Sequence, residues 1–167
     1  MSTKATQSAL VPLPTAQSVA FILTGLLGKR VTARPLAATL LGPPAPAVIA
    51  LYACDDGSPG ALAVSDLGFA CHAGAALSLI PAAMAAESVA AGCVAEVILD
   101  NLHEVFNVCA KLFNRTGSRH LVLRDLYAGW PSTPGLVVAL LNHATAQLDL
   151  EVTIPEYGTG KLAIVTV

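Results

Sequence analysis

EVILDNLHEVFNVCAKLFN, residues 96–114, is the most informative segment of this chain. At 100° per residue its apolar side chains fall on one side of a helix, and its polar side chains fall on the other. The apolar side comprises Ile98, Leu102, Val105, Phe106, Cys109, Leu112 and Phe113. The other side, which we call the polar stripe, comprises Glu96, Asp100, His103, Glu104, Asn107, Lys111 and Asn114. The pattern predicts an amphipathic helix that packs on a core through its apolar side.

Three residues of the polar stripe stand one above another. Asp100, Glu104 and Asn107 occupy positions i, i+4 and i+7 of the predicted helix. A primary amide suits hydrolysis of a phosphoryl group, because its oxygen accepts a hydrogen bond from water while its NH2 group donates to a phosphoryl oxygen. Hydrolysis of an acyl phosphate depends mainly on such positioning. The spacing, with Pro131 further along the chain, resembles the helix motif of the CheC/CheX/FliY family of chemotaxis phosphatases.

The resemblance implies a fold and a function. It implies an aspartyl-phosphate phosphatase that acts on a phosphorylated CheY-like response regulator. Asn107 would orient the attacking water, Glu104 would anchor a Lys of the partner, and Asp100 would support docking. Lys111, one turn beyond Asn107, is our own addition as a contact to the partner's acidic pocket. The resemblance implies that Mg2+ belongs to the partner, so we expect this chain to bind no cofactor and no metal.

The rest of the sequence predicts a flexible tail over residues 1–12 and a single domain over 13–167. The predicted helices cover residues 14–28, 69–79 and a long pattern from 83 to 113 that is kinked near Gly92. The predicted strands cover 30–41, 48–54, 61–66, 119–127, 136–141, 147–154 and 162–166, with loops at 43–46 and 129–135.

From this order of elements we expect an α+β fold with an antiparallel or mixed sheet of about six strands. The long motif helix and the N-terminal helix would pack on one face, as in CheC/CheX proteins. Because the N-terminal helix lacks acidic residues, only one site is possible, which looks like CheX.

Composition limits the function classes. The chain is 54% hydrophobic and 12% charged, with a net charge of −2, so it is neither disordered nor built to bind nucleic acid. Its four cysteines form no CxxC pair and suit a reducing cytoplasm. Two long uncharged stretches contain prolines or small residues, so we expect no membrane span. The high apolar content, together with the resemblance, predicts a homodimer that pairs through a sheet edge.

Parts of the sequence resemble three other kinds of functional site or module. His103-Glu104-Val105-Phe106-Asn107 is one residue from the zincin motif HExxH, but Asn is a poor zinc ligand, and His120 and His143 lack a supporting pattern. Cys71-His72 has no local signature of a nucleophilic pair. The third is a non-catalytic module of the same fold that docks a response regulator or a flagellar motor component. Replacing Asn107 separates this module from the phosphatase, since only the phosphatase depends on the positioned amide.

Overall fold

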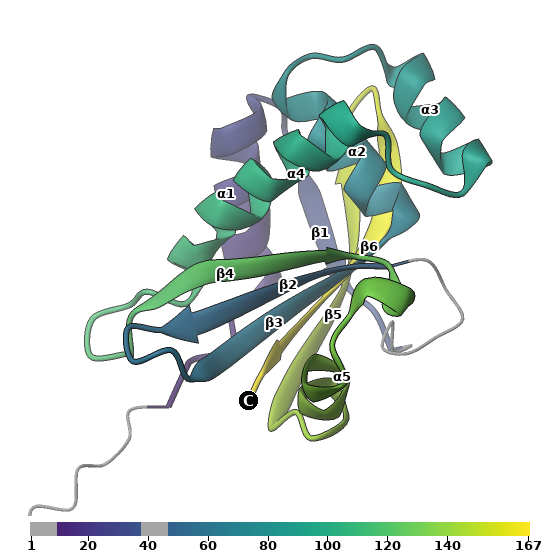
Figure 1. Cartoon of the computed structure of the whole chain (residues 1–167). Helices are drawn as coiled ribbons and strands as arrows, with labels where there is room; N and C mark the ends of the chain where they lie inside the picture. The colour runs from purple at the N-terminus through teal and green to yellow at the C-terminus, as the bar shows by residue number, and fades with distance from the viewer. Residues whose placement is uncertain (1–9, 38–46) are drawn as a thin grey trace, which may run out of the picture.

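The protein is described from a computed structural model that covers residues 10–37 and 47–167. One antiparallel six-stranded sheet forms its centre, with the strand order β1-β5-β6-β3-β2-β4. The strands are β1 (Thr32–Pro35), β2 (Ala47–Cys54), β3 (Pro59–Asp66), β4 (Leu121–Ala128), β5 (Ala146–Ile154) and β6 (Gly158–Thr166). The sheet twists strongly, so that β4, β2 and β3 run across the view of Figure 1 while β5, β6 and β1 run upward. The predicted α+β fold is confirmed.

Three helices cover one face of the sheet. They are α1 (Ala16–Leu27), α2 (Leu67–Leu77) and α4 (Glu96–Cys109), and Figure 1 shows them gathered above the strands. Thr15 caps α1 through a reciprocal hydrogen-bond pair with Ser18, and Gly28 ends the helix in the left-handed conformation. Val19 of α1, Phe69 of α2 and Phe106 of α4 share one buried apolar cluster with the sheet. This face therefore carries α2 in addition to the two helices that were predicted there.

The second face of the sheet carries a helix where a strand was predicted. Residues 136–141 lie in α5 (Gly135–Asn142), so the expected strand there is wrong. The apolar run LVVALL has no clear period and is compatible with either structure. Val137 and Leu141, one helical turn apart, pack with Ile49, Leu62 and Val165 on this face. Packing against these sheet residues is a tertiary effect, and it cannot be predicted from the local sequence pattern of residues 136–141.

The long helix predicted from residue 83 to 113 is two helices. α3 (Ala82–Ala91) ends at Gly92, which adopts the left-handed conformation, and α4 starts at Glu96 after a short connection. The two axes are bent by 103°, far more than the predicted kink. Figure 1 shows α3 projecting beyond the layer of α1, α2 and α4. Within the described ranges no single helix is long and apolar enough to cross a bilayer, and α3 and α4 reach that length only as this bent pair.

The remaining local predictions hold with small shifts. The hairpins β2–β3 and β5–β6 are antiparallel pairs, and Leu150, Val152 and Ile154 face the main core as their alternation indicates. Of the strand predicted over 30–41, the described part contains β1, which pairs with β5 over Thr32–Pro35, and residues 38–41 lie outside the described residues. A short 3-10 turn, η2 (Trp130–Ser132), lies in the loop predicted at 129–135. Most of the predicted tail and the loop at 43–46 lie outside the described residues.

Candidate functional site

Helix α4 holds the predicted site on a rigid base. Its apolar side is buried as predicted, with Ile98, Leu102, Val105, Phe106 and Cys109 each at most 3% exposed. Hydrogen bonds between α4 and two other elements add to this packing. The hydroxyl of Tyr52 on β2 donates to the carbonyl oxygen of Phe106 over 2.7 Å, and the amide of Asn101 donates to the carbonyl oxygen of Gly74 on α2 over 2.9 Å. Burial and these bonds fix the direction in which the polar stripe points.

Glu104 and Asn107 form the centre of the polar stripe. Both side chains are exposed, and the Asn107 amide nitrogen Nδ2 donates to the Glu104 carboxylate oxygen Oε2 over 3.4 Å. This distance is long for a hydrogen bond, so the amide is free to turn toward another acceptor. Within residues 10–37 and 47–167, no ion pair neutralises Glu104. An open carboxylate and an open amide thus stand side by side on one helix.

Asp100 and Lys111 flank this pair along the helix. Asp100 is exposed one turn before Glu104, and Lys111 is exposed one turn after Asn107 in the 3-10 turn η1 (Ala110–Leu112) that continues α4. Neither side chain forms an ion pair in the described part of the chain. The charge along the stripe therefore changes from negative to positive across Asn107. The roles of all four residues remain predictions.

Asn114, at the end of the polar stripe, is occupied by a structural contact. Its amide nitrogen donates to the carbonyl oxygen of Leu121, and its amide oxygen accepts from the Leu121 N–H, each over 2.8 Å. This pair of bonds ties the end of the helical segment to the start of β4. The stripe available for binding therefore ends near Lys111.

Sequence reasoning missed Tyr52 and Asn101. Tyr52 is fully buried, and burial raises the pKa of its hydroxyl well above the usual value, so it acts as a neutral donor. Asn101 also approaches Ser78, whose hydroxyl donates to the Asn101 side-chain oxygen over 3.1 Å. An Asn next to the apolar side of an amphipathic helix was the only local sign of such a contact. Tyr52 lies more than fifty residues earlier in the sequence, and nothing in its own stretch indicates its partner.

The geometry does not favour the zinc or cysteine alternatives. No three His, Cys, Asp or Glu side chains come together as metal ligands among the residues that the structure describes. His120 lies against Asp55 at the β2–β3 turn, and His143 ends α5. Burial raises the pKa of the Cys71 thiol to about 11, so it is protonated at neutral pH. A nucleophilic cysteine needs the opposite shift.

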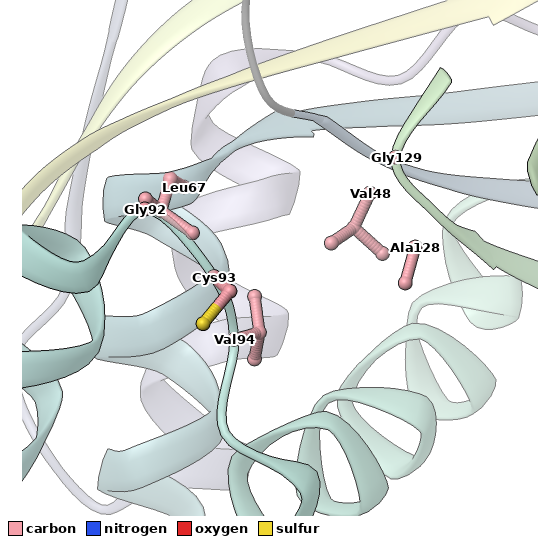
Figure 2. Close-up of a pocket in the computed structure, with 7 residues that line it drawn as sticks. All are labelled: Val48, Leu67, Gly92, Cys93, Val94, Ala128 and Gly129. Carbon is pink, nitrogen blue, oxygen red and sulfur yellow. The ribbon is translucent and has the colours of Figure 1, made fainter. Parts of the chain in front are cut away.

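A separate pocket of about 180 Å³ lies between the α3–α4 connection and the sheet. Figure 2 shows Gly92, Cys93 and Val94 on one side and Val48 and Ala128 on the other. Leu67 and Gly129 complete the described lining, which has the Cys93 thiol as its most polar side chain. No residue of the polar stripe lines it. The pocket therefore lacks the converging polar groups that bind a phosphoryl group.

Comparison with known proteins identifies the fold. No protein-family model and no curated protein sequence matches the chain. FliM in the FliM–SpeE complex from H. pylori superposes with a TM-score of 0.62 at 8% identity, over 90% of this chain and 80% of that chain. The FliM middle domain from H. pylori gives 0.58 at 10% identity, over 90% and 84%. FliY from Thermotoga maritima gives 0.55 at 14% identity, over 89% and 81%. The TM-scores establish a shared fold, whereas identities this low leave the activity open.

Proposed function

We propose, from the premise that this chain has the CheC/CheX/FliY fold, that it hydrolyses the aspartyl phosphate of a CheY-like response regulator. The observation that carries the proposal is the exposed pair of Glu104 and Asn107 on a helix whose opposite side is fully packed. A helix held in this way presents both groups to a partner surface without a rearrangement. The polar stripe is exposed from Glu96 to Lys111, so a whole domain has access to it.

In the proposed reaction, a water oxygen attacks phosphorus in line with the leaving carboxylate. The bond between phosphorus and the aspartyl oxygen breaks, the partner recovers its free carboxylate, and inorganic phosphate leaves with the water's oxygen. Asn107 accepts a hydrogen bond from the water through its amide oxygen and donates to a phosphoryl oxygen through Nδ2. Mg2+ held by the partner would neutralise the phosphoryl charge. This chain contributes position rather than a covalent intermediate.

Glu104 serves as the anchor. A carboxylate beside a phosphoryl group repels it unless a cation lies between them. The carboxylate of Glu104 lies within contact of the Asn107 amide and forms no ion pair in the described part of this chain, so it is available to a Lys beside the partner's phosphorylated Asp. Asp100 adds negative charge on the same side, and Lys111 faces the acidic residues of the partner.

Pairing of two copies of this chain through an open sheet edge completes the proposal. The eight-residue edge strand β4 is the candidate for that contact.

A non-catalytic docking module is the second candidate. One observation favours it: the FliM structures that share this fold include one crystallised in complex with another protein, SpeE. In that function the polar stripe binds a response regulator or a flagellar motor component without hydrolysis. Glu104 and Asp100 would then matter for affinity, while the amide of Asn107 would contribute little beyond one contact.

Loss of phosphate from purified, phosphorylated CheY-like receiver domains with Mg2+ separates the two candidates. The phosphatase accelerates the loss, Asn107→Ala abolishes the acceleration, and that variant still binds a receiver activated with beryllium fluoride. Asn107→Asp, which keeps the size but not the NH2 group, is the matched variant and loses the rate too. Binding without acceleration by the wild-type protein would instead support the docking module. The absence of both binding and acceleration would refute both candidates.

A further inference from the structure

An apolar groove begins where the polar stripe ends. It has a volume of about 440 Å³ and lies between α1 and the end of α4. Figure 1 shows these two helices side by side above the sheet. The lining residues are Phe21, Ile22, Thr24, Gly25, Leu26, Val108 and Lys111. Val108 is the residue after Asn107, and Lys111 is the last charged residue of the stripe, so the groove and the proposed catalytic amide share one surface.

The α1 wall of the groove is unusual for a surface helix. Residues 16–27 contain no charged side chain, and Phe21 is 77% exposed although it is large and aromatic. The residues that α1 buries are Val19, Leu23 and Leu27, so Phe21 contributes nothing to the main core. Exposed aromatic rings beside an apolar hollow are typical of protein-binding surfaces.

Gly25 keeps the groove open. It lies inside α1, where glycine is among the least favourable residues, and an added Cβ would meet no described atom within 4 Å apart from its chain neighbours and the adjoining backbone of α1. Its φ is not in the left-handed region, so neither backbone conformation nor packing requires glycine at this position. A side chain at this position would project into the hollow. Glycine at this position therefore leaves the groove unfilled, although the fold itself does not require glycine there.

We propose that the groove receives an apolar side chain of the phosphorylated receiver domain, so that the docking surface runs from Glu104 across Asn107 to Phe21. This inference rests on the proposed function. A receiver that brings its phosphoryl group to Asn107 also covers Val108 and Lys111, which lie within about one helical turn of 5.4 Å. Stable protein interfaces bury about 800 Å² on each partner, which is more than three polar side chains supply. Lys111 at the edge of the groove matches the acidic and phosphoryl groups that surround the receiver's site.

Two variants test the groove, each with a control on α5, across the sheet. Phe21→Ala removes the exposed ring, and Leu136→Ala removes a side chain that is 70% exposed on α5. Gly25→Leu fills the groove, and Gly135→Leu adds the same side chain at a glycine of α5 that also has open space around it. The measurements are the Kd for CheY-like receiver domains activated with beryllium fluoride and Mg2+, and kcat and KM for dephosphorylation.

We expect Phe21→Ala and Gly25→Leu to raise Kd and KM by about tenfold or more, with kcat little changed, while both controls behave as wild type. Normal thermal melts for Gly25→Leu exclude misfolding as the cause. Unchanged binding by Phe21→Ala and Gly25→Leu, with hydrolysis still lost in Asn107→Ala, would overturn the groove and leave the proposed function standing. Unchanged receiver binding with a loss of self-association would assign the groove to a second copy of this chain. No receiver binding by the wild-type protein would overturn both proposals.

Discussion

The hydroxyl of Tyr52, on the central strand β2, donates a 2.7 Å hydrogen bond to the backbone carbonyl of Phe106, the residue that precedes Asn107. At the end of α4 the Ala110 N–H donates to the carbonyl oxygens of Asn107 and Val108. The Phe106 carbonyl is thus one of the helix-end acceptors that need a partner from elsewhere. The Tyr52 bond supplies it and ties the sheet to the turn of α4 that carries the proposed catalytic amide.

Tyr52→Phe should therefore destabilise the protein by about 1–3 kcal/mol, because it leaves a buried carbonyl oxygen without its donor while the ring still fills its place. Denaturant unfolding measures this difference. Tyr127→Phe is the control, since Tyr127 is only partly buried on the other face of the sheet. Equal stabilities of wild type and Tyr52→Phe would show that the bond adds nothing to the attachment of α4.

Glu104→Gln should weaken binding of an activated receiver domain by about tenfold, because the substitution removes the charge that pairs with the partner's Lys. The wild-type affinity should fall as salt rises, and this dependence should be shallower in the variant. Titrations at low and high ionic strength measure both effects. Glu87→Gln on α3 is the matched control, since Glu87 is exposed and lies outside the polar stripe. A receiver that binds Glu104→Gln as tightly as wild type would contradict the anchoring role.

Gly160→Ala should destabilise the protein by about 3 kcal/mol or more, since an added Cβ would lie 2.0 Å from the backbone nitrogen of Phe69. This close approach lets Asp66 accept hydrogen bonds from both the Phe69 and the Lys161 N–H groups, which joins the start of α2 to β6. Gly25→Ala, in open space within α1, should instead stabilise by up to about 1 kcal/mol. Thermal or denaturant unfolding distinguishes the opposite signs. A neutral Gly160→Ala would show that the two elements separate easily.

Stability should fall in alkaline solution. Burial raises the pKa of the Cys109 thiol from 9.0 to about 12, and it also raises that of Tyr52. The unfolded chain releases these protons at lower pH than the folded chain does, so it binds fewer protons over this range. The free energy of unfolding should therefore decrease toward pH 12 by about 1.4 kcal/mol per pH unit for each group, beginning near pH 9 for Cys109 and near the ordinary pKa of 10.0 for Tyr52. Unfolding at several pH values should give a shallower decrease for Cys109→Ala, and equal slopes would contradict this assignment.

Several features followed from local sequence alone. The period of residues 96–114 predicted which side of the helix is buried, and the seven apolar residues assigned to that side are all in the core. The β2–β3 hairpin and the limits of α1 also followed, because turn and cap residues act on neighbours a few positions away. Such patterns reflect burial of one side of an element, which repeats with the element's own geometry.

Other features depend on contacts between distant parts of the chain. Residues 136–141 became a helix because the second face of the sheet needed a cover, and the 103° bend after Gly92 set the direction of α4 independently of α3. The bond between Tyr52 and Phe106 joins positions 54 residues apart. Helical periodicity is local, so the amino-acid pattern was enough to predict which residues of α4 face solvent. The contacts that hold this helix and the groove beside it could not be predicted in this way, since both depend on elements that the chain brings together by folding.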